Sequence, residues 1–404
     1  MRTLLKESKM EKDFGLNVEF MSKELKLLFA ILKLQDDETM QTYSNEWFSD
    51  IDWEVFLEQA VHHRVYPVIY QKLKQVDKEL IPSHIVQTLT RKYKRNTFQM
   101  LYLSAEMERI NKLCNENEIR TIFLKGPVLS QDLYGDLSLR TSCDLDVLIP
   151  IQNLEKAEKL LLEQGYVKDD YIQTILSDWK WRHHHITFFH PTRRIKLEIH
   201  WRLNPGPGKE PGFEELWKRK RKSAHTSNSV YMLGKEDLFL FLVSHGARHG
   251  WSRLRWLVDI KKIVDQDLNW SEIHKLMRKY QMLHLGGQAL ILASQLLGVR
   301  LDERMMELVT KKHSKQLAQE ALFYFKQMIN LHTDPVPEEV LAYHSRHLFS
   351  LMSNQQKILF IMSQLYPYPI DAKTLPLPKF LHFLYFPLRP FLCLWRKTKK
   401  LALS

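Results

Sequence analysis

The feature of this sequence that most restricts its fold is a change in hydrophobic spacing near residue 120. Before it, in residues 18–34, 53–76 and 90–119, apolar side chains recur at the intervals of amphipathic helices. Between residues 120 and 203, short apolar runs that end at glycine or proline alternate with helical stretches, and the last two runs are joined only by a turn. This order predicts a small mixed α/β sheet unit inside a mostly helical chain.

The remainder of the chain returns to helical spacing after a proline- and glycine-rich stretch, residues 204–212, which predicts a linker. The strongest helical block, residues 235–264, predicts two helices with a break near Gly250. We therefore expect an α+β protein in which a small mixed β-sheet core is flanked by helical regions. The expected boundaries are 1–112 for an N-terminal helical region, 113–204 for the α/β core, 205–370 for a C-terminal helical domain and 371–404 for an apolar and basic tail.

Charge and cysteine content narrow the class of protein. The 404 residues carry a formal net charge of +12, which favours anionic partners such as nucleotides, nucleic acid, acidic lipid or phosphorylated substrates. Cys114, Cys143 and Cys393 form no CxxC pair, which argues against a disulfide framework or a zinc site. No stretch has the roughly 18 consecutive apolar residues of a spanning helix, and the N-terminus lacks the apolar segment of a secretory signal. We therefore expect a cytoplasmic protein.

Two acids in the second expected strand are the main functional signal. Asp144 and Asp146, in the segment RTSCDLDVLIP, are separated by one residue, so in a strand their side chains point to the same face. Like charges at this spacing repel each other unless a cation lies between them. Glu198, in the otherwise apolar run IKLEIHW, supplies a third carboxylate on another expected strand. Such a set suits Mg²⁺ or a two-metal site for phosphoryl displacement, although each acidic motif alone is common in structural positions.

The order of these motifs resembles that of the DNA polymerase β-like nucleotidyltransferase superfamily. Its members share a glycine-containing strand end followed by a helix, then an acid–hydrophobic–acid strand, and later a strand with a single acid. The chain is more closely similar to a bacterial nucleotidyltransferase-like family with the ordered pattern LKG, LY, R with DLD, GY, an acid followed by HW, and HGxxH. The matching residues, within a resemblance that covers residues 45 to about 300, are Leu124-Lys125-Gly126, Leu133-Tyr134, Arg140 with Asp144-Leu145-Asp146, Gly165-Tyr166, Glu198-Ile199-His200-Trp201 and His245-Gly246-Ala247-Arg248-His249.

This resemblance implies an enzyme that transfers a nucleotidyl group, or a related phosphoryl group, from an NTP to an acceptor. It implies that Asp144 and Asp146 hold Mg²⁺ against the triphosphate, and that Glu198 completes a second metal site or acts as base on an acceptor hydroxyl. One or two Mg²⁺ ions are the implied cofactors, and ATP is the expected donor. The residues expected to bind the nucleotide are Lys125, Gly126, Arg140 and Ser142.

The chain departs from the wider superfamily at Gly126-Pro127, where relatives usually have Gly-Gly or Gly-Ser. Proline removes one backbone N–H that would bind phosphate. The separation between Gly126 and the acid pair is also longer than in the compact pattern. A solvated surface position is the alternative for Arg140, and a turn cap is the alternative for Ser142.

Histidines near these motifs form a second group of candidates. His185 and His200 are expected near Glu198, where they either assist proton transfer or serve as hydrogen-bonded structural residues. The three consecutive histidines at 183–185 are not expected to reach one metal ion together. His245 and His249 lie four residues apart, on one helical face, but the sequence offers no third zinc ligand. The candidates for acceptor or phosphate binding are therefore His185, His200, His245, Arg248 and His249, with packing around an Arg255–Asp259 ion pair as the alternative for this helix.

The leading function is thus Mg²⁺-dependent transfer to a small-molecule, peptide or protein acceptor. The basic composition supports RNA as an alternative acceptor, although the sequence contains no RNA-binding motif such as an aromatic RNP strand or a GxxG loop. A non-catalytic nucleotide-binding or interaction module with a decayed site is a further alternative. The substitution at Pro127 supports this last alternative, and the presence of all three acids opposes it.

The C-terminal tail, LPLPKFLHFLYFPLRPFLCLWRKTKKLALS, is rich in Phe and Leu and has a basic end. We expect it to fold back onto the helical domain. Contact with a membrane surface, with aromatic residues down and Lys and Arg up, is the alternative. Pro387 and Pro390 are expected to interrupt any long helix.

Overall fold

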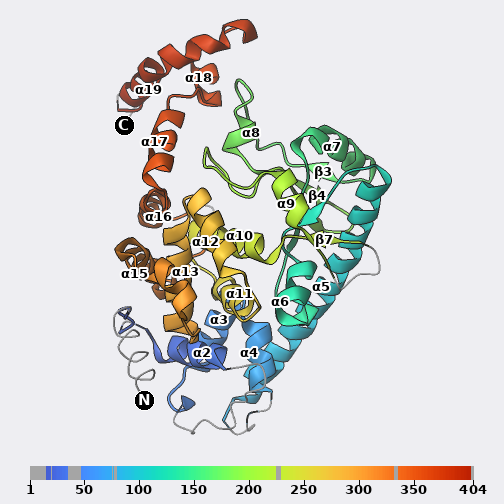
Figure 1. Cartoon of the computed structure of the whole chain (residues 1–404), viewed down its shortest axis with the longest axis vertical. Coiled ribbons are helices and arrows are strands. Elements are labelled where there is room, and N and C mark those ends of the chain that lie inside the picture. Colours follow the sequence, from blue (N-terminus) through green and yellow to red (C-terminus); the bar gives the residue numbers. More distant parts are fainter. Residues whose placement is uncertain are drawn as a thin grey trace.

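A mixed β-sheet lies to one side of a large array of helices (Figure 1), so the chain is an α+β protein, as the sequence predicts. Residues 1–14, part of the expected N-terminal helical region, lie outside the described residues. None of the helices within the described ranges has the length and apolar character needed to cross a membrane. The computed structural model describes residues 15–19, 21–34, 47–74, 76, 80–223, 229–331 and 335–401.

The strands of the described chain form one sheet in the order β3-β4-β5-β2-β1-β7-β6. β4 and β5 form the expected antiparallel hairpin, and β5 pairs in parallel with β2. β6 and β7 come from beyond the expected linker and extend the sheet through β1. Their two-residue length is too short for a recognisable strand pattern. The strands are β1 (Ile122–Phe123), β2 (Asp144–Leu148), β3 (Val167–Lys168), β4 (His185–His190), β5 (Ile195–His200), β6 (Arg221–Lys222) and β7 (Tyr231–Met232).

The helices before the sheet follow local sequence signals. Asp52 caps α3 by accepting from the backbone N–H groups of Glu54 and Val55, and Pro67 lies in the first turn of α4. The long helix α5 spans 34 residues and packs against α6, the 3-10 turn η3 and β2. These elements are α2 (Lys23–Lys33), α3 (Trp53–His62), α4 (Tyr66–Leu73), α5 (Ser83–Glu116), α6 (Pro127–Tyr134) and η3 (Leu137–Leu139).

The later helices pack mainly on one another. The expected break near Gly250 is confirmed and separates α10 from α11. Gly250 has a φ of +61°, and a Cβ there would lie 2.4 Å from the ring of Tyr324, so both backbone conformation and packing favour glycine. The elements between β2 and α16 are η4 (Ile151–Asn153), α7 (Leu154–Glu163), α8 (Trp179–Arg182), α9 (Phe213–Arg219), α10 (Lys235–Arg248), α11 (Leu254–Val264), α12 (Trp270–Lys279), α13 (Leu283–Leu297), η5 (Glu303–Met305), α14 (Met306–Val309), α15 (Lys312–Lys326) and α16 (Glu338–Ser350).

The C-terminal segment is more helical than the sequence analysis expects. One helix, α19, runs through both prolines, so the expected interruption is wrong. Pro387 lies in the first turn, where a missing N–H costs no intrahelical hydrogen bond, while Pro390 lies inside the helix on its exposed side. The elements are α17 (Asn354–Ser363), α18 (Pro369–Thr374), η6 (Lys379–Leu384) and α19 (Tyr385–Leu401).

A buried ion pair connects the chain just before β2 with the helices. The Arg140 guanidinium donates to the Asp259 carboxylate of α11 through Nε and Nη2, both at 2.9 Å, and both side chains are almost fully buried. Tyr134 also donates its hydroxyl to Asp259 at 2.7 Å. The ion pair of Asp259 is therefore with Arg140, and the expected Arg255–Asp259 pair is wrong. The Arg140 guanidinium, a candidate for phosphate binding, is occupied by this contact.

We expect Asp259→Ala to lower the free energy of unfolding by about 3–5 kcal/mol, because it leaves the buried Arg140 charge without a partner. The matched control is Glu116→Ala, which removes the partner of the exposed Lys112 in a surface ion pair and should change the free energy by less than about 1 kcal/mol. Urea denaturation followed by circular dichroism measures both values. Equally small losses in the two variants would show that the buried pair contributes no more than a surface contact.

Candidate active site

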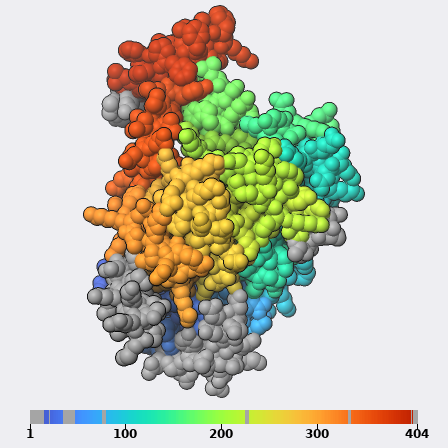
Figure 2. Space-filling view, viewed as in Figure 1, coloured from blue at the N-terminus to red at the C-terminus, as the bar shows by residue number. Residues whose placement is uncertain are grey.

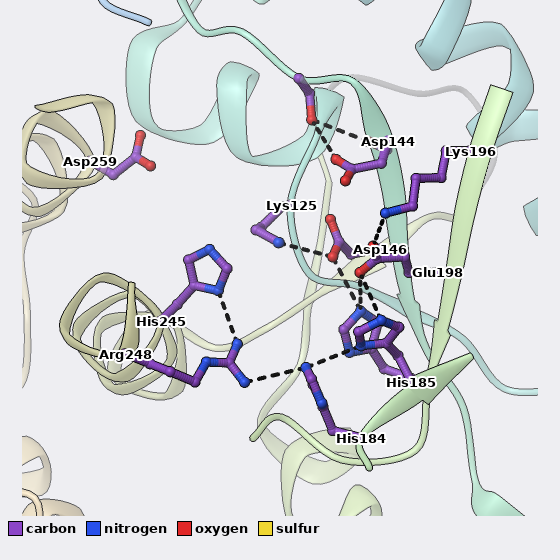
Figure 3. Close-up of polar contacts among 12 residues, drawn as sticks. Lys125, Asp144, Asp146, His184, His185, Lys196, Glu198, His245, Arg248 and Asp259 are labelled. Atoms are coloured by element: carbon purple, nitrogen blue, oxygen red, sulfur yellow. Dashed lines mark hydrogen bonds and ion pairs between the residues drawn. The ribbon is translucent and has the colours of Figure 1, made fainter. Parts of the chain in front are cut away.

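The three candidate carboxylates come from two adjacent strands. β2 and β5 pair in parallel, with Asp146 directly opposite Glu198 and Asp144 opposite Lys196. Residues opposite each other across a ladder project to the same side of the sheet, and so do residues i and i+2 of one strand. Asp144, Asp146 and Glu198 therefore share one face (Figure 3), which is the geometry that the three-carboxylate hypothesis requires.

Asp146 has no exposed side-chain surface. Its Oδ1 lies 2.9 Å from Nζ of Lys125 and 3.1 Å from Nε2 of His200, while its Oδ2 has no hydrogen-bond partner among the described residues. Burial alone would raise the pKa of Asp146, but the Lys125 ammonium and the hydrogen bond with His200 outweigh it and hold the pKa below its ordinary value. Asp146 is thus an ionised carboxylate with one oxygen paired and one buried oxygen that has no partner among the described residues.

Glu198 is surrounded by an ammonium group and two imidazoles. Its Oε1 lies 2.6 Å from Nζ of Lys196, and its Oε2 lies 3.5 Å from Nε2 of His200 and 3.7 Å from Nε2 of His185. Burial would raise the pKa of Glu198, but the hydrogen bond with His200 and the nearby His185 bring it well below its ordinary value. His200 contacts both Asp146 and Glu198 and so fixes the two carboxylates relative to each other.

Asp144 is the least compensated of the three acids. The Ser142 hydroxyl lies 3.2 Å from the Asp144 carbonyl oxygen and 3.4 Å from its Oδ1, so Ser142 contacts an acid of the site. Burial and repulsion from Asp146 raise the pKa of Asp144 above its ordinary value. A cation bound at this carboxylate would relieve both effects.

The chain between β1 and α6 places Lys125 next to Asp146. The backbone N–H of Leu124 donates to the carbonyl of Asp146 at 2.9 Å, which holds this segment against β2. Gly126 follows with a φ of 78°, in the left-handed region that glycine adopts most easily. Pro127 then starts α6, a position where its fixed φ is favourable. The Lys-Gly-Pro sequence is therefore a turn that directs the Lys125 ammonium at the carboxylates.

A cavity of about 590 Å³ lies between the carboxylates and the helices. His245 and Arg248 of α10 face the carboxylate group across it (Figure 3). Further groups come from α11 and from the turn before α4. The lining residues are Arg64, Lys125, Cys143, Asp144, His184, His185, Lys196, Glu198, His200, Leu203, Phe241, His245, Arg248, His249, Arg253, Arg255 and Trp256.

The helical wall of this cavity contains arginines that have no carboxylate partner among the described residues. Within the described residues, no ion pair forms at Arg64, Arg248, Arg253 or Arg255. Arg248 contacts Nε2 of His184 at 3.3 Å and Nδ1 of His245 at 3.5 Å, and its Nε has no partner. Burial lowers the pKa of Arg248 to about 10 and that of Arg255 to about 9. Buried cations without anionic partners are costly, so this wall favours binding of an anion.

Histidines fill the space between the two walls. His184 and His185 approach His200, so two of the three consecutive histidines do meet at one place, while the His183 ring packs against Tyr171. Burial lowers the pKa of His185 to about 4. Its imidazole is therefore neutral at pH 7, with a nitrogen that can accept a hydrogen bond or bind a metal ion. Two groups have ligand atoms within 4.8 Å of one another and could hold a metal ion: His184, His185 and His200, and Asp146, Glu198 and His200.

His245 and His249 share one face at the C-terminal end of α10, as their spacing predicts. Their ring centroids are 4.6 Å apart, and both rings contact Trp256. Burial lowers the pKa of His245 well below its ordinary value. Both imidazoles line the cavity wall.

Most of the residues singled out in the sequence lie at this site, but Arg140 does not line the cavity. The sequence analysis missed Arg64, His184, Lys196, Arg253 and Arg255 as cavity residues. Strand periodicity could have identified Lys196, because it lies two residues before Glu198 on the same face. The arginines come from segments distant in sequence, and no local pattern marks them. The structure gathers Lys125, Asp144, His185, Glu198, His200, His245, Arg248 and His249 around the cavity, with Gly126 and Ser142 beside it. Asp146 is fully buried and does not line the cavity, but it contacts two residues that do, Lys125 and His200.

Residues 49–298 match a protein family described as an uncharacterised nucleotidyltransferase. The chain belongs to this nucleotidyltransferase family, and the family resemblance inferred from the order of the motifs is confirmed. The matched span includes every strand of the sheet and every residue that lines the cavity. No curated protein and no solved structure matches the chain.

The different surroundings of the two aspartates give different expectations for stability. Asp144→Asn removes a repelled charge and should leave the free energy of unfolding unchanged or raise it by up to about 1 kcal/mol. Asp146→Asn weakens the contacts that Lys125 and His200 both make with this side chain, and it should lower the free energy of unfolding by about 1–3 kcal/mol. Urea denaturation at pH 7 with a chelator present measures both. The same change in the two variants would contradict this distinction.

Proposed function

We propose that the protein transfers a nucleotidyl group from an NTP to a small-molecule or peptide acceptor in a Mg²⁺-dependent reaction. The observation that carries this proposal is a cavity with carboxylates on one side and arginines without anionic partners on the other. Asp144 and Glu198 line the carboxylate side, and the buried Asp146 lies directly opposite Glu198 in the sheet. Carboxylates bind divalent cations and guanidinium groups bind phosphate, and a metal–nucleotide complex presents both kinds of charge. The family resemblance makes ATP the expected donor.

The donor atoms suit a divalent cation. Buried polar atoms are normally hydrogen-bonded, yet Oδ2 of Asp146 is buried without a partner, and the neighbouring Asp144 is a carboxylate whose ionised form is disfavoured. Asp144, Asp146 and Glu198 would hold one or two Mg²⁺ ions. The bound metal would supply neutralisation of the phosphate charge that develops during transfer. His200 would keep Asp146 and Glu198 in position.

Side chains would take over most of the phosphate binding from the backbone. Pro127 offers no N–H at the position where the wider superfamily offers one. Lys125 on the sheet side and Arg248 and Arg255 on the helical side supply cations instead. Arg255 already donates to the carbonyl and the hydroxyl of Thr141, so its guanidinium is fixed in place, whereas Arg248 has contacts only to imidazoles and retains free donors among the described residues.

A second cavity supports a small acceptor. It has a volume of about 480 Å³ and shares Arg248 with the first cavity. Cavities of this size with apolar walls and few polar groups are typical of small-molecule sites. We assign it to the acceptor, whose nucleophile would then reach the carboxylates past Arg248. The apolar lining includes Met282, Leu285, Leu348, Leu351 and Phe360, opposite the segment 202–210.

Incubation of the protein with labelled NTPs and Mg²⁺, followed by mass spectrometry of candidate acceptors, tests the proposed transfer. We expect label on a small molecule or peptide, and a loss of about 100-fold or more in the Asp144→Asn and Asp146→Asn variants, because a charged group that stabilises the transition state is removed. Label found on RNA alone would favour the RNA-directed alternative. NTP binding without transfer to any acceptor would favour a non-catalytic module.

The role of Arg248 is separable from folding. Arg248→Met should weaken NTP binding by about 10–100-fold, because a hydrogen bond to a charged group contributes about 1.5–3 kcal/mol. The free energy of unfolding should stay the same or rise, since a buried cation without a counter-ion is removed. Titration calorimetry with ATP and Mg²⁺ and urea denaturation measure the two effects. The control is Arg300→Met, at an exposed position outside the cavity. Lower stability with unchanged NTP affinity would instead assign Arg248 a structural role.

A further inference from the structure

The C-terminal helices carry an unusual amount of exposed apolar surface. Of the 23 large hydrophobic side chains exposed in the described chain, 12 lie between residues 358 and 395. These residues belong to the segment from α17 to α19, which extends beyond the sheet and the main helical array at one end of the molecule (Figures 1 and 2). Contiguous exposed apolar surface marks a site of contact with another molecule or a membrane.

α19 has one face that packs and one that does not. On the packed face, Tyr385 and Leu392 contact Ile175 and residues around α18, and Asp371 pairs with the two arginines of α19. Apart from Ile175, which precedes α8, these contacts lie within the tail itself and along only one side of α19. The opposite side, continued by η6, is apolar. We call it the apolar tail face, and its residues are Phe380, Phe383, Phe386, Phe391, Leu394 and Trp395, which are 41–76% exposed.

The charge of this region has a single sign. Residues 340–404 contain one acid, Asp371. Asp371 is buried and its two oxygens pair with Arg389 and Arg396, so it leaves no negative charge on the surface. The Lys and Arg residues of this stretch are Arg346, Lys357, Lys373, Lys379, Arg389, Arg396, Lys397, Lys399 and Lys400.

We propose that the apolar tail face docks onto an anionic lipid surface. Phe, Leu and Trp side chains on one side of a helix enter the boundary between headgroups and acyl chains, while neighbouring Lys and Arg residues attract anionic headgroups. This combination of apolar and cationic groups provides the two signals that stable peripheral binding requires. The described helices do not qualify as membrane-spanning, which fits a segment that lies on the surface.

The charge argues against a second copy of the chain as the occupant. A twofold contact places the same surface patch of each subunit against the other. Here it would bring two cationic segments together, with no unpaired acid between residues 340 and 404 to compensate them. An anionic bilayer satisfies both the apolar side chains and the positive charge.

The proposal is independent of the proposed enzymatic activity. The apolar tail face lies beyond residues 49–298, the span shared with the nucleotidyltransferase family, and none of its residues lines the cavity with the carboxylates. Loss of lipid binding and loss of nucleotide transfer can therefore be measured separately.

Sedimentation of the full-length protein with vesicles tests this inference. We expect binding to vesicles of phosphatidylcholine with 30% phosphatidylserine, weak binding to phosphatidylcholine alone, and a decrease of about tenfold or more when salt is raised from 0.1 to 0.5 M. The double variant Phe391→Glu/Trp395→Glu should bind at least about tenfold more weakly. A second variant, Phe380→Glu, changes a side chain that is 76% exposed and should act in the same direction.

The matched control is Phe98→Glu, which changes an equally exposed phenylalanine, 73% exposed, on α5. It should bind vesicles like the wild type, and ATP binding should be unchanged in all variants. Absence of vesicle binding by the wild type, equal binding to neutral vesicles, or equal loss in the Phe98→Glu control would each overturn the proposal. A concentration-dependent dimer that the double variant abolishes, without vesicle binding, would assign the face to a second copy.

Discussion

The parallel pairing of β2 and β5 places Asp146 opposite Glu198, and the other groups of the site respond to this concentration of negative charge. Lys125, Lys196 and His200 lie within 2.6–3.5 Å of the two carboxylates. They compensate part of the charge and leave one oxygen of Asp146 unbonded. Part of the negative charge therefore stays uncompensated, and a further cation bound here would neutralise it.

A second charge imbalance lies across the cavity, with the opposite sign. Arg248 and Arg255 are buried without an anionic partner in the described chain, and burial makes their protonated forms less favourable. Arg140 differs from these two arginines. It is equally buried, but two of its nitrogens donate to the Asp259 carboxylate. Arg140, which has a carboxylate partner, joins the two sides of the molecule, and arginines without a carboxylate partner line the space between them.

Local patterns in the sequence account for the sheet core and for the acids on it. Period-two spacing places Asp144 and Asp146 on one face, and the order of motifs indicates the family, both without three-dimensional information. The basic wall is different, because Arg64 and Arg253 are brought to the cavity by packing between distant helices. The partner of Asp259 shows the same limit. Helical spacing suggests Arg255, but the tertiary structure brings in Arg140 from 119 residues away. The two-residue strands likewise depend on pairing with their neighbours rather than on local preference.

The proline after Gly126 has an evolutionary consequence. A backbone amide that cradles phosphate belongs to every residue except proline, so a point mutation rarely removes it. A guanidinium group, in contrast, disappears with a single codon change. Under the proposed function, donor recognition is divided among arginines on helices, so members of such a family could exchange one nucleotide donor for another while the strands and their carboxylates remain untouched. A shared sheet with its carboxylates would then be a poor guide to which donor each relative uses.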